Sequence, residues 1–269
     1  AQSWRSLSIM NIYIVCAHPE PASFNNSLVT AATVSFENLG HKVKVTDLYA
    51  HDFDPCEHAR HFHPRKNSHR FDVQAEQRFG YENDALPAQV ESQLAAIHWA
   101  DLVIVQFPLW WFGAPAMLKG WMDRVLVYGG LYSSEQRFEQ GVCRGKKVLL
   151  CVTTGSSADE CAPNGREGNT HLLLWPIQYA FRYVGFDVLQ SYLVHGIWAD
   201  CTASGRDLNE ELRRYSSFCA NIDQAAVLPF NSPTDWDEHG QLKQGAPSYT
   251  PFIQHPGNRD SATTLIAEK

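Results

Sequence analysis

Short apolar runs alternate with amphipathic segments along most of this chain. Residues 11–17 (NIYIVCA), 101–107 (DLVIVQF) and 146–153 (KKVLLCVT) are almost continuously apolar and rich in β-branched side chains. Such runs are typical of strands that are buried on both faces of a parallel sheet. Residues 41–47, which alternate between polar and apolar, and residues 186–194 predict two further strands. The pattern therefore predicts five strands.

Segments with helical periodicity lie between these strands. Gly40 is a stop signal for the first predicted helix, and Pro115 is expected at the first position of the third. Strands that alternate with helices indicate a parallel sheet with right-handed crossovers and helices on both faces. With five strands, we expect an α/β fold with a flavodoxin-like sheet. The predicted helices span residues 27–39, 88–99, 115–127, 169–184 and 207–220.

Two parts of the chain lack this alternation. Residues 50–87 are polar and rich in histidine, with little periodicity before residue 73, and we expect the stretch from His51 to His69 to be a solvated loop. The spacing of these histidines matches no helical H-x-x-x-H ligand pair with a carboxylate, so we predict no metal site, although His61 and His63 could chelate a metal adventitiously. Residues 10–228 are predicted to form one flavodoxin-like domain. Residues 229–269, rich in proline, glycine and polar side chains, are predicted to form an irregular C-terminal arm without a core of its own.

Composition narrows the classes of function. The chain has 269 residues, of which 44% are hydrophobic and 19% charged, enough apolar material for a core. A net charge of −7 provides no basic surface for nucleic acid. Apolar runs such as residues 102–108 are too short to span a bilayer, and residues 1–10 lack a secretory pattern. Seven widely spaced cysteines without a C-x-x-C pair favour a reducing cytoplasm.

Three loops are expected to meet at one edge of the sheet, because ligands of open α/β sheets bind beyond the carboxyl ends of the strands. These loops are residues 18–25, 108–114 and 154–168. In the first loop, Ser23 and Asn25 precede a helix and suit either phosphate binding or ordinary helix capping. No G-x-G-x-x-G or Walker A pattern is present, which disfavours a dinucleotide of the usual Rossmann type.

The second and third loops suit a flat ligand. Trp110, Trp111 and Phe112 place aromatic rings at the end of a strand, either against such a ligand or against a packing partner. In the third loop, Gly155 and its small neighbours allow close approach of the backbone. Their N–H groups would stabilise negative charge on a reduced ring system.

A series of motifs across residues 11–220 makes the comparison with known families specific. They are AHPEPASFN at 17–25, ADLVIVQFPLWWFG at 100–113, PAMLKGW at 115–121, TTG at 153–155, LWPIQ at 174–178 and GF at 185–186. In this order and spacing, the chain resembles the NAD(P)H:quinone oxidoreductase (DT-diaphorase-like) family of flavodoxin-fold flavoproteins.

The resemblance implies a tightly bound FAD, with FMN left open by the residues, and NAD(P)H as hydride donor. It implies a homodimer that reduces a quinone-like acceptor by two electrons in a ping-pong cycle. By residue, the resemblance assigns the cofactor phosphates to His18, Phe24 and Asn25, and the adenosine end to Arg206. It assigns the isoalloxazine to Leu109, Trp110, Trp111 and Phe112, and the pyrimidine side of that ring system to Thr153, Thr154, Gly155 and Ser156. It assigns the substrate pocket to Trp111, Phe112, Tyr132 and Tyr183.

The third loop departs from the family pattern. Family members carry a tyrosine and a histidine there, thought to stabilise the reduced flavin, and the ungapped positions here are Cys161 and Glu167. We hypothesise that Arg166 and the Gly155 N–H supply this stabilisation instead; a solvated Arg166 is the alternative. The departure leaves two other functions open. One is reduction of azo, nitro or free-flavin acceptors, and the other is a flavin-binding regulatory subunit of the potassium-efflux type.

Overall fold

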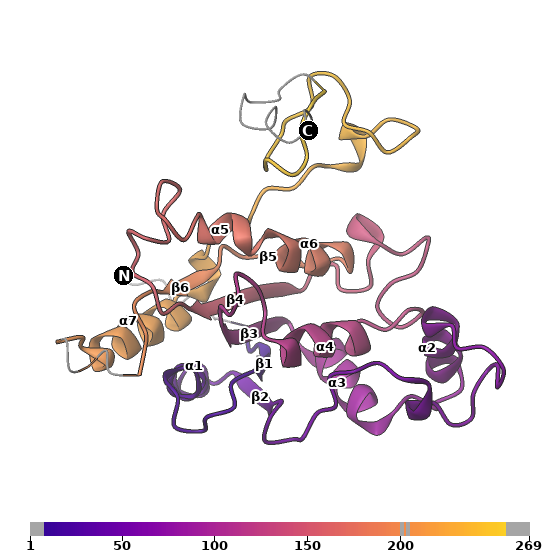
Figure 1. The fold of residues 1–269 in the computed structure, drawn as a ribbon, viewed down its shortest axis with the longest axis horizontal. Helices are drawn as coiled ribbons and strands as arrows, with labels where there is room; N and C mark the ends of the chain where they lie inside the picture. Colours follow the sequence, from indigo (N-terminus) through magenta and orange to yellow (C-terminus); the bar gives the residue numbers. More distant parts are fainter. Residues whose placement is uncertain (1–7, 200–201, 203–204, 257–269) are drawn as a thin grey trace, which may run out of the picture. The chain divides into compact units, whose positions relative to one another are not determined.

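The fold is built on a single parallel sheet (Figure 1). The computed structural model describes residues 8–199, 202 and 205–256, so expectations for residues 1–7, Cys201 and 257–269 lie outside it. Strand order is β2-β1-β3-β4-β5, with β6 also paired to β4, and every pair is parallel. This order confirms the predicted flavodoxin-like sheet. The strands are β1 (Asn11–Cys16), β2 (Lys42–Asp47), β3 (Leu102–Pro108), β4 (Lys147–Thr153), β5 (Asp187–Val188) and β6 (Tyr192–Val194).

The predicted fifth strand is interrupted. In β5, Val188 pairs with Val148, whereas in β6, Tyr192 pairs with Cys151, so the offset along the chain changes from 40 to 41 residues. One extra residue between the two segments forms a bulge. At this point the Gln190 N–H leaves the ladder and donates to the carbonyl of Ala226 at 2.8 Å. The single strand expected over residues 186–194 is therefore two short strands.

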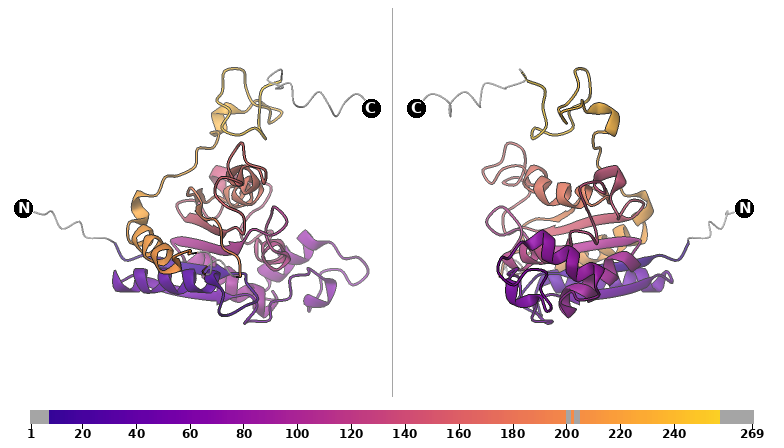
Figure 2. Two further views of the ribbon diagram at one scale, coloured as in Figure 1. Left: turned by 60° about the vertical axis from the view of Figure 1, so that its left-hand side comes forward. Right: turned by 90° about the vertical axis from the view of Figure 1, so that its right-hand side faces the viewer.

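Helices cover both faces of the sheet. Helices α1 and α7 pack together on one face, where Ser35 Oγ donates to the Ser216 carbonyl at 2.9 Å, and α3, α4 and α6 lie on the other (Figure 2). The helices are α1 (Phe24–Asn38), α2 (Val73–Glu82), α3 (Ala88–Trp99), α4 (Ala116–Val125), α5 (Thr170–Leu173), α6 (Trp175–Tyr183) and α7 (Leu208–Ala220).

Several helix boundaries differ from the sequence expectation. Helix α1 begins three residues early, because the Ser23 side chain accepts the Asn26 N–H and caps the helix at that point. Pro115 is the N-cap of α4 and not its first residue. The helix expected over residues 169–184 is divided at Leu174 into α5 and α6. Pro176, which lacks an N–H, lies at the start of α6 and prevents a continuous hydrogen-bond ladder.

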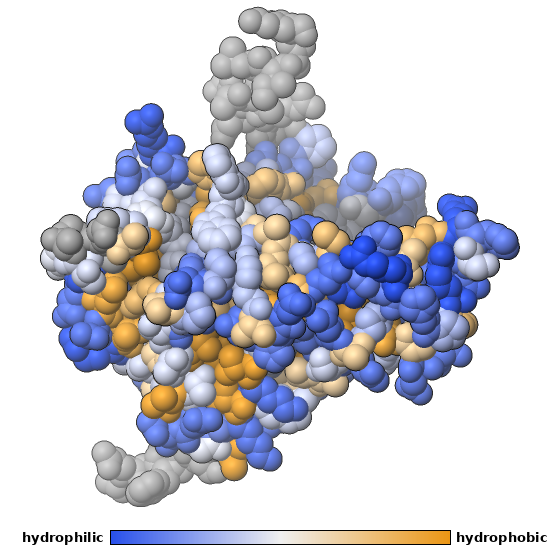
Figure 3. All heavy atoms as spheres, turned by 60° about the horizontal axis from the view of Figure 1, so that its bottom comes forward, coloured by the Kyte–Doolittle hydropathy of each residue, from blue (hydrophilic) through white to orange (hydrophobic). Residues whose placement is uncertain are grey.

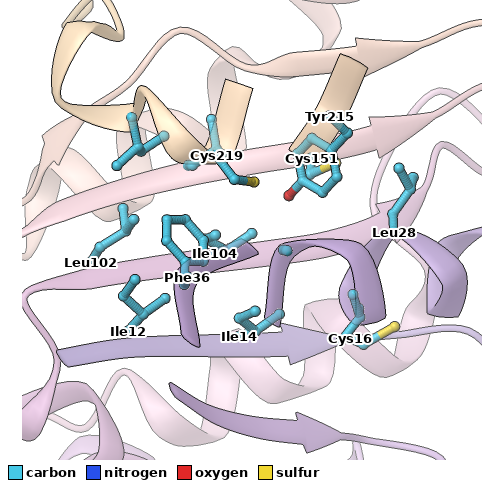
Figure 4. Close-up of a cluster of buried hydrophobic side chains, with 14 of the residues drawn as sticks. Ile12, Ile14, Cys16, Leu28, Phe36, Leu102, Ile104, Cys151, Tyr215 and Cys219 are labelled. Carbon is cyan, nitrogen blue, oxygen red and sulfur yellow. The ribbon is translucent and has the colours of Figure 1, made fainter. Parts of the chain in front are cut away.

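Apolar side chains fill the space between the sheet and the α1–α7 layer (Figure 4). Ile12, Ile104 and Phe36 are fully buried there, together with Tyr215 and Cys219 of α7. Burial raises the pKa of the Cys219 thiol to about 12. Thiols in such surroundings stay protonated and act as small apolar side chains.

The histidine-rich segment is a largely exposed loop, as predicted, but buried aromatic side chains anchor it to the domain. Phe53 and Phe62 are each 2% exposed. Arg124 of α4, also buried, donates to the Asp54 carbonyl at 2.6 Å and pairs with Glu57 at 3.3 Å. The polar composition of this segment does not reveal the packing, because the charge of the buried Arg124 is neutralised by its ion pair with Glu57. Among the described residues, no three His, Cys, Asp or Glu side chains are grouped as a metal site.

Residues from Leu228 onward form a second unit, separate from the unit that ends at Val227. Of residues 228–256, Asn231 alone is classed as buried, and its amide donates to Asp235 and to the Pro247 carbonyl.

Figure 3 shows apolar groups scattered among polar side chains on the face it displays. None of the helices in the described part of the chain is long and apolar enough to cross a membrane.

Candidate functional site

A buried amide network joins the ends of three secondary-structure elements. Asn25, in the first turn of α1, donates from Nδ2 to Thr153 Oγ1 at 3.0 Å, and its Oδ1 accepts from Gln106 Nε2 at 2.8 Å. Asn25 and Gln106 are 3% and 1% exposed. The structure thus places the Asn25 side chain inside the junction. Gln106 was not predicted, although a glutamine in an otherwise apolar strand is a visible signal.

The N-terminus of α1 faces the carboxyl edge of the sheet and suits an anion. The first turn of α1 contains no acidic residue, and the free N–H groups of a helix start carry partial positive charge. Nearby, His18 Nδ1 accepts the Glu20 N–H at 3.1 Å, and the His18 ring lies 6.0 Å from the Trp110 ring. Ser23 caps the helix, which is one of the two alternatives for this loop, and anion binding at the same helix start stays a prediction.

The second loop is a strained turn. Trp110 and Gly113 exchange both backbone hydrogen bonds, at 3.1 and 3.0 Å, and the two residues between them have φ of 49° (Trp111) and 61° (Phe112). This is the geometry of a type I′ turn, which favours Asn-Gly and not two aromatic residues. Trp111 is 96% exposed and Phe112 53%. Strain of this kind is concentrated at functional sites, and here it presents two rings beside the strand ends.

The third loop presents free backbone donors. Among the described residues, nothing accepts a hydrogen bond from the N–H of Gly155 or Ser156. A Cβ on Gly155 would meet only the Ile197 carbonyl, at 3.9 Å, so the space above this backbone is open. Thr154 Oγ1 donates to the Ser156 carbonyl at 2.9 Å and holds the turn.

A cavity of about 240 Å³ lies between the second and third loops. Its lining combines apolar rings and side chains with small polar groups and one carboxyl. The lining residues are Leu109, Trp111, Phe112, Thr154, Gly155, Ser156, Cys161, Glu167, Thr170 and Leu173. A mainly apolar cavity with a few convergent polar groups is the usual form of a small-molecule site.

His195 is a neighbour of this site that sequence reasoning missed. Its Nδ1 lies 2.8 Å from Thr154 Oγ1, and since that hydroxyl donates to Ser156, it accepts from His195. Burial lowers the pKa of His195, and the charges of His171 and Arg206 lower it further. These surroundings favour the neutral imidazole. No sequence motif around residue 195 indicates the contact of His195 with Thr154, because this contact depends on β6 lying beside β4.

Other predicted residues lie outside the cavity lining. Arg166 is exposed, and its charge contributes to a lowered pKa of Glu160, for which hydrogen bonds from Ser157 are the larger cause. Tyr132 and Tyr183 lie in an aromatic cluster, with ring centroids 5.6 Å apart. Arg206 pairs with Glu211 at 3.3 Å.

By resemblance, residues 72–77 correspond to the segment from which the family takes an adenine contact. Two polar side chains of this segment are occupied within the chain. Glu76 accepts the N–H groups of Lys66 and Asn67 at 2.7 and 3.1 Å. Gln77 donates to Glu57 and accepts the Tyr128 N–H at 3.1 Å. Glu76 and Gln77 therefore hold the fold of this region.

Comparison with known proteins agrees with this geometry. Residues 10–218 match the family described as having a flavodoxin-like fold. NAD(P)H dehydrogenase [quinone] 1 of Rattus norvegicus is 37% identical over 193 residues, which cover 71% of this chain and 70% of that protein. The ribosyldihydronicotinamide dehydrogenase-like protein traD of Penicillium crustosum is 35% identical over 268 residues, 95% of each chain, so this similarity extends through the C-terminal arm.

A solved structure supports the same grouping. A Klebsiella pneumoniae protein described as a quinone reductase superposes with a TM-score of 0.78 and 28% identity, covering 87% of this chain and 94% of that one. Sequence and fold therefore agree on the relationship. The chain belongs to the flavodoxin-like NAD(P)H:quinone oxidoreductase family, a family of oxidoreductase enzymes.

Proposed function

We propose that this protein is a flavin-dependent NAD(P)H oxidoreductase that reduces quinone-like acceptors by two electrons, with FAD as the flavin. The observation that carries the proposal is the junction of the free Gly155 and Ser156 N–H groups with the strained Trp111–Phe112 turn. Its relatives are quinone dehydrogenases by name. The free thiols of the described cysteines suit a cytoplasmic protein.

The residues present fit a flavin. The α1 start, with His18 and Phe24 beside it, would hold phosphate; Trp110, Trp111 and Phe112 would flank the ring system. Gly155 and Ser156 would donate to its pyrimidine edge, across the open space above Gly155. A flavin held there would supply the chemistry of hydride transfer from NAD(P)H to the acceptor, while the protein orients the reactants.

The protein's own contribution is electrostatic. Backbone N–H groups in a fixed turn stabilise negative charge without rearrangement, and Thr154 fixes this turn through the Ser156 carbonyl. Arg166 stays a candidate for additional stabilisation of the negative charge on the reduced flavin. Because its side chain is exposed, the Arg166→Ala variant can be compared directly with the wild type. An unchanged rate of flavin reduction in that variant would remove Arg166 from the proposal.

We also propose a homodimer. Tyr132 and Tyr183, assigned by resemblance to the substrate pocket, lie outside the cavity lining of their own chain. A second copy would let them face the partner's cavity. Light scattering coupled to size-exclusion chromatography measures the mass, and a monomer of 30.3 kDa would contradict the dimer.

The visible spectrum of the purified protein, together with the mass of the released cofactor, tests the central proposal. We expect a bound flavin of the mass of FAD; FMN would correct the cofactor, and failure of both to bind would overturn the function. Initial rates against NADPH and a quinone should give parallel double-reciprocal lines. Intersecting lines would contradict the ping-pong cycle.

A second candidate function keeps the flavin and changes the acceptor. Cys161 and Glu167 line the cavity where the family carries tyrosine and histidine, which alters the groups offered to an acceptor. A panel of azo, nitro and free-flavin acceptors compared with quinones separates the two candidates by kcat/KM.

A further inference from the structure

The cavity contains one acidic side chain in an otherwise uncharged lining. Leu109, Trp111, Phe112 and Leu173 provide the apolar part, and Glu167 provides the one carboxyl among the lining residues. Glu167 is partly buried. Any molecule that enters this space therefore meets a single negative charge at short range.

The Glu167 carboxylate has no partner in the part of the chain that the structure describes. No hydrogen bond or ion pair to its oxygens is found there, in contrast to Glu57, Glu76 and Glu160, which all have such partners. Arg166 is exposed and acts on Glu160. The charge of Glu167 is thus not neutralised by a neighbouring cation of the described residues.

The loop that carries Glu167 is held in place. The Glu167 N–H donates to the Glu160 carbonyl at 2.9 Å, and the Thr170 N–H donates to the Cys161 carbonyl at 3.2 Å. Gly165 packs so closely on the Glu160 carbonyl that a Cβ would lie 2.2 Å from its oxygen. Because these backbone contacts close the loop, Glu167 has a fixed place in the cavity wall.

We propose that Glu167 selects the charge of the electron acceptor, so that the cavity favours aromatic acceptors that are cationic or carry a hydrogen-bond donor and disfavours anionic ones. This inference rests on the proposed function and specifies its substrate class. The overall reaction is unchanged: acceptor quinone, NAD(P)H and one proton give hydroquinone and NAD(P)⁺. An unpaired charge in the wall of a mainly apolar cavity attracts a cationic ligand and repels an anionic one.

The test compares three naphthoquinones: the neutral parent, a sulfonate and a derivative with a trimethylammonium group. Their kcat/KM values are measured with the flavin-loaded wild type, Glu167→Gln and Glu167→Lys. The substitutions change the charge of the cavity, and intrinsic differences in reactivity among the quinones cancel when the cation-to-anion ratio is compared between variants. Asp159→Asn is the matched control, since Asp159 is exposed in the same loop and loses the same charge outside the cavity.

We expect Glu167→Gln to lower the cation-to-anion ratio by about tenfold and Glu167→Lys to invert the preference, with Asp159→Asn unchanged. Equal ratios in wild type and Glu167→Gln would overturn the inference. Equilibrium dialysis of the oxidised quinones, without NADPH, measures the same discrimination as Kd. If no variant turns over, the proposed reductase function fails, and the dialysis ratios still decide the role of Glu167.

Discussion

Asn25 Nδ2 donates to Thr153 Oγ1 across 3.0 Å, joining the start of α1 to the end of β4 over 128 residues of sequence. The same amide accepts from Gln106 at the end of β3. One side chain therefore fixes the relative positions of the three strand-end loops. This explains why a buried amide occurs where a conventional helix would have a solvent-exposed polar residue.

Asn25→Ala should lower the free energy of unfolding by about 2–3 kcal/mol, because it leaves the buried Gln106 amide without its acceptor. Urea unfolding measures the change. Asn38→Ala is the control, since Asn38 is exposed at the end of the same helix. Similar stability of both variants would mean that the network contributes nothing to the junction.

Replacing Trp111 and Phe112 with Asn and Gly should stabilise the protein without cofactor by about 1–2 kcal/mol, since Asn-Gly adopts positive φ at low cost. The same double variant should bind flavin more weakly, because both exposed rings are lost. Urea unfolding and flavin titration measure the two effects. Trp111→Phe keeps the strain and should leave unfolding unchanged; a stability gain in that control would refute strain as the cause.

Stability should fall in mild acid because of His195. Its pKa in the folded protein is lowered from 6.5, chiefly by burial, so the unfolded chain takes up a proton that the folded chain resists. The free energy of unfolding should therefore decrease as pH falls below about 6.5 towards the folded pKa. His195→Gln should flatten this part of the profile, whereas His69→Gln, at an exposed position, should not. Parallel profiles of wild type and His195→Gln would contradict the assignment.

Gly120→Ala should destabilise the packing of residues 52–58 against α4. An added Cβ would lie 2.0 Å from the Pro55 carbonyl oxygen, which cannot move without displacing the neighbouring Asp54 carbonyl that accepts from Arg124. We expect a loss of about 3 kcal/mol and faster tryptic cleavage near Arg60 and Arg65. Lys119→Ala, which loses only an exposed ion pair with Asp123, should cost less than about 0.5 kcal/mol. Equal cleavage rates in the two variants would argue against this close contact.

The sequence predicted the sheet because its central strands β1, β3 and β4 are buried on both faces, so apolar runs such as residues 101–107 have no other stable environment. It also predicted which loops meet, since the carboxyl ends of parallel strands share one edge. Features that depend on one local contact or one residue could not be read from the apolar pattern. The bulge between β5 and β6 and the division at Leu174 each follow from one local backbone contact or one proline.

Only the tertiary structure decided what the polar residues do. Residues 51–69 look solvated by composition, yet Glu57 within them pairs with the buried Arg124, 67 residues further along the chain. The positive φ of Trp111 and Phe112, the contact of His195 with Thr154 and the place of Glu167 in the cavity lining likewise arise from placement in space. Apolar burial is a collective property that periodicity records, whereas hydrogen bonds and ion pairs join particular atoms from distant parts of the chain, and one-dimensional spacing does not record them.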